Sequence, residues 1–370
     1  MRPFILLRVV KLTMLNDLII HIGSPKAGST SIQNLATSCT TALSENGIFY
    51  PKSTNSGNHQ FFTHKFCKSP ISKGFNKVLN IPDDDVVRLR ENEWSIFTSN
   101  LANNFDAAII SAESLFANYK DIDFEMLKKW CQEHSKRTHI VCLLREPYHA
   151  ASSLVQQLVK TGGVSNKTEV TKVLGYDAVF NPYDALINWI NYFGIEYVKL
   201  YSFEEMLQVT ANQDFSKVML SNFINLICPS LDCDPIFKET SWENKKLNKS
   251  LSKTGFDIAW NLSQVLPFSE RTAFTSKVIQ KALLELSDGE KFNIFQTDLV
   301  TENFQKNIAL QINKLNNLVG YNPFSNLKVK GSFDNLDEFV IGEDERNIRF
   351  ANALAMVVRE FNGQSKQAAV

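Results

Sequence analysis

A turn rich in glycine and hydroxyl residues near the start of the sequence offers the clearest chemistry. It reads GSPKAGST, residues 23–30, and joins the apolar run 18–22 to a segment with helical periodicity. The first N–H groups of a helix have no partner within the helix, and the helix dipole makes that end positive. An anionic group can therefore bind at Gly28, Ser29 and Thr30, with the Lys26 ammonium beside it.

The spacing of this turn differs from that of the loop G-x-x-x-x-G-K-[ST] found in nucleoside triphosphatases. Gly23 and Gly28 keep the separation of the two glycines, but Ser29 stands in the lysine position and the lysine has moved to Lys26. The sequence also offers no obvious Asp at a strand end to hold a magnesium ion. We therefore expect an anion site built from protein donors alone, with no metal. The alternative is an ordinary strand–turn–helix connection with an exposed lysine.

The elements that must position this turn alternate between strand and helix. Apolar runs typical of buried strands occur at 18–22, 48–50, 106–111, 138–144 and 197–201, and helical patterns lie between them. Such alternation predicts a parallel sheet. The expected fold class is therefore α/β, a phosphate-loop-type parallel sheet flanked by helices on both faces, with a mostly helical C-terminal part.

The expected domain organisation has three parts. Residues 1–13 precede the organised pattern and are predicted to be a disordered extension, unless the start codon is placed too far upstream. Residues 14–330 are predicted to form the α/β domain. Residues 331–370 are predicted to be a C-terminal extension that is partly helical.

Charge and composition argue against some partners. Lys plus Arg and Asp plus Glu both number 39, so no overall field attracts nucleic acid or an anionic membrane surface. The apolar run 4–10 is broken by Arg8 and is too short to span a bilayer, so we expect no integral membrane segment. The six cysteines are scattered without a CxxC pair, which indicates reduced thiols and a cytoplasmic protein.

Polar residues directly follow several predicted strands, and the carboxyl ends of parallel strands meet at one edge of a sheet. Glu113 comes after the run 106–111, and Arg145 comes after the run 138–144. Ser153 lies eight positions beyond Arg145 on a predicted helix. Arg145 and Ser153 are therefore candidates to hold a second anionic group.

That helix, 147–161, begins with a proline and ends before two glycines. Its expected polar face, opposite the apolar positions, carries His149, Ser153, Gln156, Gln157 and Lys160. The segment after it, 161–177, is predicted to be a mobile loop. In a plainer interpretation of the region, Arg145 pairs with Glu146 or Asp184, and Ser153 is a surface serine.

At these residues the sequence resembles the sulfotransferases that use 3′-phosphoadenosine 5′-phosphosulfate. PKAGST, residues 25–30, is similar to the family's 5′-phosphosulfate loop, and Arg145 with Ser153 is similar to its 3′-phosphate motif. The wider segments HIGSPKAGSTSIQ, residues 21–33, and GIFYP, residues 47–51, resemble the bacterial branch that acts on carbohydrates. The resemblance covers roughly residues 14–252 and, loosely, the helix 304–319.

The resemblance implies a transfer of the sulfuryl group from this donor to a hydroxyl of a carbohydrate or glycolipid. It implies that the donor is a co-substrate, that no metal is needed, and that Lys26 stabilises charge on the bridging oxygen as the S–O bond breaks. The residues it assigns to donor binding are Lys26, Ala27, Gly28, Ser29, Thr30, Ser31, Arg145 and Ser153. The family's basic, glycine-containing segment has no clear copy, and Lys245, Lys246 and Lys249 are either its replacement or a solvated charge run.

A hydroxyl acceptor must lose its proton during the transfer, so a base is expected near the loop. His59 and Glu113 are the two candidates, because related polysaccharide sulfotransferases use a His or a Glu in this role. A histidine on a loop has a near-neutral pKa suited to general-base work. Glu113 could instead bind acceptor hydroxyls or orient Lys26.

Two other functions compete with this one. A small-molecule kinase using magnesium and ATP would carry a lysine where Ser29 stands and an Asp at a strand end, and neither is found. A non-catalytic nucleotide- or glycan-binding relative would keep the same residues without turnover. A small alcohol is an open alternative to the carbohydrate acceptor.

Overall fold

The computed structural model describes residues 14–53, 57–68, 83–101, 105–176, 178–209, 214–238, 251–266 and 299–324. It also describes 283, 292, 294, 297, 344, 345, 347–352, 354 and 355. The predicted extension 1–13, the predicted domain end at residue 330 and the stretch with Lys245, Lys246 and Lys249 lie outside the described residues. No helix in the described part of the chain is both long and apolar enough to cross a membrane.

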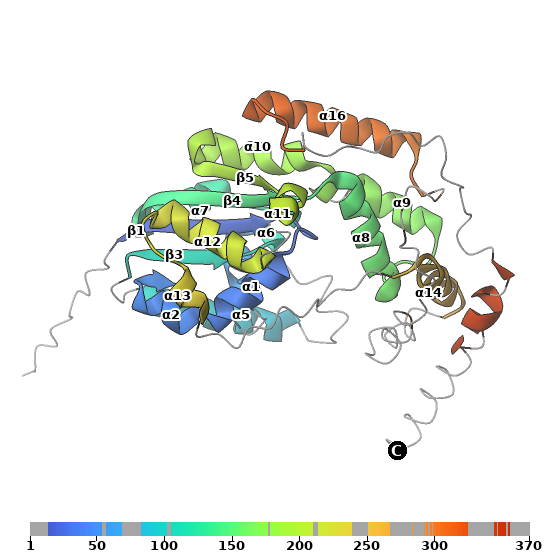
Figure 1. Ribbon diagram of the computed structural model, residues 1–370, viewed down its shortest axis with the longest axis horizontal. Coiled ribbons are helices and arrows are strands. Elements are labelled where there is room, and N and C mark those ends of the chain that lie inside the picture. The colour runs from blue at the N-terminus through green and yellow to red at the C-terminus, as the bar shows by residue number, and fades with distance from the viewer. Residues whose placement is uncertain are drawn as a thin grey trace, which may run out of the picture. The chain divides into compact units, whose positions relative to one another are not determined.

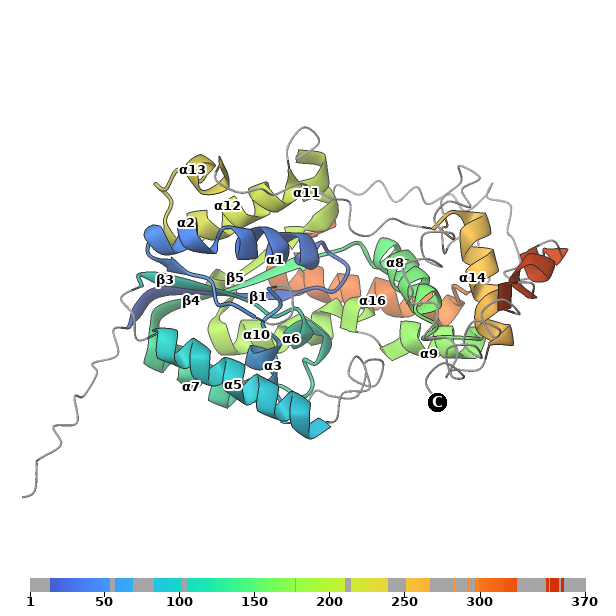
Figure 2. The ribbon, with the colours of Figure 1, turned by 90° about the horizontal axis from the view of Figure 1, so that it is seen from below.

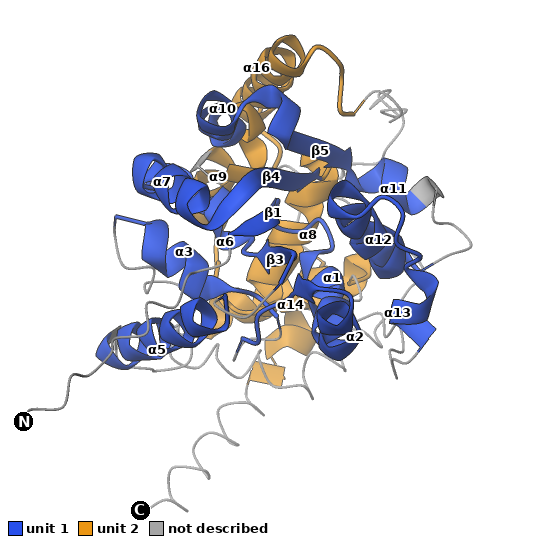
Figure 3. Ribbon diagram, turned by 90° about the vertical axis from the view of Figure 1, so that its left-hand side faces the viewer, with its two compact units in different colours: residues 1–144, 184–244 blue, residues 145–183, 245–370 orange. Residues whose placement is uncertain are grey.

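The chain divides into two compact units (Figure 3). The first contains residues 1–144 and 184–244, and the second contains residues 145–183 and 245–370. The predicted α/β domain, 14–330, therefore includes parts of both units. Each unit is described by itself below.

The first unit is built on a five-stranded sheet in which every pair of neighbours is parallel. The strands are β1 (Leu15–Gly23), β2 (Ile48–Phe49), β3 (Ala107–Ser111), β4 (Ser135–Leu144) and β5 (Val198–Ser202). Their order is β2-β3-β1-β4-β5, so the strand that enters the phosphate loop is central. The parallel sheet and all five predicted strands are confirmed.

Helices cover both faces of this sheet (Figures 1 and 2). One face carries α1 (Ser29–Ser38), α2 (Thr40–Glu45), α11 (Phe203–Val209), α12 (Phe215–Ile227) and α13 (Asp234–Lys238). The other carries α3 (Gln60–Phe66), α5 (Asp83–Leu101), α6 (Ser114–Ala117), α7 (Phe124–His134) and α10 (Pro182–Phe193). The predicted α/β class, with helices on both faces, is confirmed.

Each face buries its own apolar cluster. On the α1 face, Leu35 of α1 and Phe223 of α12 belong to one buried cluster with Ile19 of the central strand. On the other face aromatic rings pack closely, and the Phe62 and Trp130 ring centroids are 5.4 Å apart. These clusters cover both faces of the sheet. The ends of the strands are therefore where polar side chains can meet a ligand.

The second unit is mostly helical. It contains α8 (Pro147–Lys160), α9 (Lys167–Tyr176), the 3₁₀ helix η1 (Ala178–Phe180), α14 (Lys253–Val265) and α16 (Glu302–Val319). Val155 of α8 and Trp260 of α14 are members of one buried cluster that also holds Phe304 of α16. The mostly helical C-terminal part expected from the sequence is confirmed.

The predicted mobile loop 161–177 is wrong, because most of it is helix α9. Val170 and Leu174 are buried four residues apart on one face of this helix. At its start, Asn166 Oδ1 accepts from the Glu169 N–H at 2.9 Å, and Glu169 Oε2 accepts from the Ser165 N–H at 2.7 Å. These reciprocal bonds satisfy the orphan groups of the first turn, as in a capping box.

Gly175 of α9 offers a test of this helix. A Cβ built at Gly175 meets no atom within 4 Å, and alanine loses less backbone entropy than glycine in a helix. We expect Gly175→Ala to raise the free energy of unfolding by about 0.5–1 kcal/mol in urea denaturation. Unchanged or lower stability would show that this segment is not held as a helix in solution.

Candidate functional site

The turn that the sequence predicts to bind phosphate lies at the end of the central strand. β1 ends at Gly23, and α1 begins at Ser29 with Gly28 as its N-cap in the left-handed conformation. Ser24 fastens the loop to β4, because its N–H and its Oγ donate to the Leu143 carbonyl at 2.7 Å and 2.9 Å. The strand, the turn and the helix start are therefore where the sequence placed them.

Lys26 lies at the crest of this loop with an unusual backbone. Its φ is 68°, a left-handed conformation that costs a residue with a Cβ about 1–2 kcal/mol. Such cost is tolerated where the surrounding structure fixes the position, and it concentrates at ligand sites. The Lys26 side chain is half-buried.

The hydroxyl of Ser29 lies at the start of α1, beside Glu113. Ser29 Oγ is buried and has no hydrogen-bond partner among the described residues. It nevertheless lies close enough to the Glu113 carboxylate to favour the charged form of that group. In the same turn Ala27 is buried, Thr30 is exposed and Ser31 is half-buried.

Glu113 lies beside the loop. A Cβ built on Gly23 would stand 3.4 Å from both the Cα and the Cβ of Glu113, so the two backbones approach closely. Burial raises the pKa of Glu113 above its usual range, while the Ser29 hydroxyl and the Lys26 ammonium lower that pKa in part. Glu113 therefore lies close to Lys26 and Ser29, although it comes from a separate part of the sequence.

The imidazole ring of His59 is not exposed to solvent. Its side chain is fully buried, its Nδ1 accepts from the Ser111 N–H at 2.9 Å, and its Nε2 donates to the Pro51 carbonyl at 2.9 Å. Burial lowers its pKa to about 4, with the Pro51 carbonyl acting in the opposite direction. The ring is therefore neutral at ordinary pH with both nitrogens engaged, which favours Glu113 over His59 as the group that accepts a proton.

A buried polar network at Ser111 holds these parts together. Ser111 Oγ accepts from Gln33 Nε2 of α1 at 3.1 Å and pairs with His21 Nδ1 of β1 at 2.8 Å. Its carbonyl also accepts from the His59 N–H at 2.8 Å. Sequence reasoning did not give His21 or Gln33 a role. The available signal was a polar residue inside an apolar strand and another on the apolar face of a helix.

Arg145 and Ser153 belong to the second unit. Arg145 directly follows β4 and is half-buried, as is Ser153 on α8. The start of α8 is capped by Glu146, whose Oε2 accepts from the His149 N–H at 2.7 Å. The helix and its proline-first start are as predicted.

The sequence placed Gln156 on the open polar face of the helix, and this prediction is wrong. It is buried, and its Oε1 accepts from the Leu251 N–H at 2.8 Å. The reason is that α8 packs against α14, and the chain entering α14 presents a main-chain donor that needs an acceptor. Gln156 therefore has a structural role.

Two further findings bear on cofactors and redox state. Within the described ranges, no group of three or more His, Cys, Asp and Glu side chains could hold a metal ion. All six cysteines are free thiols in the structure.

Comparison with known proteins gives a likeness of fold. No protein-family model matches the sequence, and no curated protein matches it. Among solved structures, a sulfotransferase from Alicyclobacillus acidocaldarius is 14% identical with a TM-score of 0.40, over 84% of this chain and 97% of that one.

Two other solved structures are similar to this chain. The sulfotransferase domain from the curacin biosynthetic pathway is 12% identical with a TM-score of 0.39, over 81% of this chain and 99% of that domain. The sulfotransferase domain from the Synechococcus PCC 7002 olefin synthase is 10% identical with a TM-score of 0.36, over 74% and 94%.

Gly28 allows a test of the loop geometry. A Cβ at this position would stand 2.7 Å from Phe215 Cε1 and 3.0 Å from Phe203 Cε2, and φ is +81°. We expect Gly28→Ala to lower the free energy of unfolding by clearly more than the ~1–2 kcal/mol of backbone strain alone, because two rings must move. Urea denaturation measures the loss.

The matched control is Gly320→Ala at the end of α16. Gly320 has a similar φ of +78°, but a Cβ there meets nothing within 4 Å. It therefore reports the strain without the clash. Equal losses for the two variants would show that the Phe203 and Phe215 rings do not confine the loop.

Proposed function

We propose that the protein is a sulfotransferase that moves the sulfuryl group of 3′-phosphoadenosine 5′-phosphosulfate to a hydroxyl of a carbohydrate or glycolipid. One observation carries the proposal: Glu113 lies beside Lys26 and the buried Ser29 hydroxyl at the start of α1. An anion-binding helix start, a lysine and a half-buried carboxylate supply what such a transfer needs. The choice of 3′-phosphoadenosine 5′-phosphosulfate as the donor follows from the resemblance of residues 25–30 to the family's 5′-phosphosulfate loop.

The donor would be held by protein groups alone. The 5′-phosphosulfate takes the N–H groups at the start of α1, the hydroxyls of Ser29, Thr30 and Ser31, and the Lys26 ammonium, while Ala27 shapes the loop. Arg145 and Ser153 take the 3′-phosphate, which distinguishes this donor from ATP. The buried Ser29 Oγ at the start of α1 fits this role, since a hydroxyl can donate to an anion bound there.

The chemistry follows from the charges on the loop. The acceptor oxygen attacks sulfur as its proton passes to the Glu113 carboxylate, and the bond from sulfur to the bridging oxygen of the donor breaks. The Lys26 ammonium stabilises the negative charge that grows on that oxygen. The raised pKa of Glu113 helps, because a carboxylate of higher pKa is a stronger base.

His59 has a positioning role in this proposal. Its ring and its main chain both bond to Ser111, which precedes Glu113 by two residues. A neutral imidazole that donates at one nitrogen and accepts at the other can hold this geometry, whereas an imidazolium cannot accept from the Ser111 N–H.

A cytoplasmic location, inferred from the cysteine spacing, is part of the proposal.

Exchange of Glu113 tests the base. Glu113→Gln should lower turnover by about 10²–10⁴-fold with near-normal donor affinity, because the amide keeps the shape and cannot accept the proton. In the wild type, turnover should fall as pH drops through the raised pKa of Glu113, where the carboxyl becomes protonated. Transfer of labelled sulfate to a panel of oligosaccharides measures both effects.

The companion variant is His59→Ala. It removes two buried hydrogen bonds, so we expect lower stability and reduced turnover whose pH midpoint is unchanged. If His59→Ala instead abolished the acid limb of the profile while Glu113→Gln turned over normally, His59 would be the base.

Arg145 and Ser153 can be tested by binding alone. Arg145→Ala and Ser153→Ala should each weaken 3′-phosphoadenosine 5′-phosphate by about 1.5–3 kcal/mol, the usual value of a charge-assisted bond. Adenosine 5′-phosphate, which lacks the 3′-phosphate, should lose little. Calorimetric titration of both nucleotides gives the comparison, with exposed Gln157→Ala of the same helix as control. Equal losses for both nucleotides would remove the two residues from the 3′-phosphate site.

A further inference from the structure

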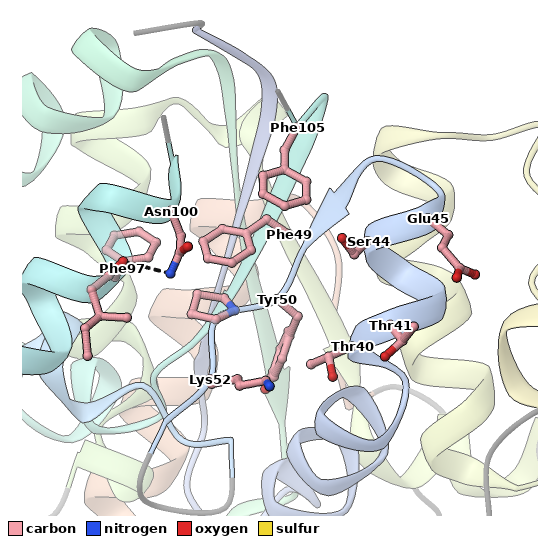
Figure 4. A pocket seen from close by; sticks show the side chains of 12 residues that line it. Thr40, Thr41, Ser44, Glu45, Phe49, Tyr50, Lys52, Phe97, Asn100 and Phe105 are labelled. Carbon is pink, nitrogen blue, oxygen red and sulfur yellow. Dashed lines mark hydrogen bonds between the residues drawn. The ribbon is translucent and has the colours of Figure 1, made fainter. Parts of the chain in front are cut away.

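A groove of about 470 Å³ runs along the edge strand β2 in the first unit, apart from the residues of the phosphate loop. Figure 4 shows side chains of α2 on one side and of α5 on the other, with β2 and the segment after it between them. Its volume lies in the range of about 300–1,000 Å³ that is typical of small-molecule sites. No residue predicted to act in the transfer lines this groove.

Phenylalanine rings line the groove between the two helices. The Phe49 ring lies nearly parallel to that of Phe105, with centroids 4.9 Å apart and an interplanar angle of 16°. It is also nearly parallel to Phe97, at 6.1 Å and 7°. Phe49 and Phe105 are only half-buried, and Ile96 beside them is 51% exposed. The floor is therefore apolar, and solvent reaches part of it.

The rim of the groove is polar and electrically balanced. Exposed Thr41 and Ser44 of α2 contribute hydroxyls, and Asn100 of α5 contributes an amide whose Nδ2 donates to the Ile96 carbonyl at 2.9 Å. Lys52 and Glu45 add one positive and one negative charge. The rim thus has donors and acceptors but no net charge to select a strongly anionic ligand.

We propose that this groove binds sugar rings, as a second site for an oligosaccharide. A sugar ring has an apolar face of C–H groups and an edge of hydroxyls that both donate and accept. The first matches the phenylalanine floor, and the second matches the hydroxyl and amide rim. The absence of net charge at the rim favours a neutral sugar over a nucleotide or a phosphopeptide.

Hydrogen bonds join the groove to Ser111, two residues before the proposed base. Pro51 lines the groove, and its carbonyl accepts from His59 Nε2 at 2.9 Å. His59 Nδ1 in turn accepts from the Ser111 N–H at 2.9 Å, and Glu113 follows two residues later. The role of the groove as the site for the non-reacting sugars of the acceptor rests on the proposed function.

The test is titration of neutral oligosaccharides of one to six sugars, from cellulose, chitin and starch, into the nucleotide-free protein. We expect affinity to increase with length and Ser44→Arg to weaken binding at least tenfold, because a long cation then lies over the floor. Ser38→Arg is the matched control, since Ser38 is an exposed serine of the adjacent helix α1 that does not line the groove. Both substitutions are on the surface, so the fold survives.

Binding of none of these oligosaccharides, or equal binding by Ser44→Arg and Ser38→Arg, would overturn the groove proposal. So would capture of an extended peptide along β2 that the sugars do not displace. Binding of 3′-phosphoadenosine 5′-phosphate to the same variants separates the two proposals. If the nucleotide binds and groove-dependent sugar binding is absent, only the groove fails. If sugars bind in the groove and the nucleotide does not bind, only the transfer fails.

Discussion

The site depends on one buried group of hydrogen bonds centred on Ser111 at the carboxyl end of β3. Ser111 joins Gln33 of α1, His21 of β1 and the ring of His59. Each partner comes from a different element. The hydrogen bonds therefore fix the positions of α1, the central strand β1 and the segment after β2 relative to one another. Buried polar groups are costly unless satisfied, so this arrangement admits few alternatives. Glu113 follows Ser111 by two residues and is positioned by the same group of hydrogen bonds.

The charges of the site are balanced against burial. Burial raises the pKa of the Glu113 carboxyl, and the nearby Ser29 hydroxyl and Lys26 ammonium lower it in part. The same lysine is held by a strained backbone at the crest of the loop. The proposed function uses this balance, with Glu113 as the base and the Lys26 ammonium facing the anionic donor. His21 and His59 stay neutral because burial lowers their pKa values to about 3 and about 4.

Most of the fold, and the proximity of Glu113 to the turn with Lys26 and Ser29, could be predicted from sequence, because the signals are local. The apolar run, the glycine turn and the helix start are adjacent, and parallel strands bring Glu113 to the same edge. Three expectations failed or shifted because they depend on distant contacts. Helix α9 has few apolar residues, and Val170 and Leu174 are buried only through contacts with other elements. Gln156 is buried where it accepts a hydrogen bond from a main-chain N–H 95 residues away. The burial of His59 depends on Ser111, which lies in another element.

Calorimetric titration of 3′-phosphoadenosine 5′-phosphate without metal, beside ATP with magnesium, tests the central claim most directly. The account predicts tight, metal-independent binding of the first nucleotide, with a matching rise in melting temperature, since a ligand at about 100 times its Kd stabilises a protein by about 2.7 kcal/mol. Lys26→Ala and Ser29→Ala should both weaken it. Tighter binding of ATP with magnesium, or binding of 3′-phosphoadenosine 5′-phosphate that ignores both substitutions, would contradict the account.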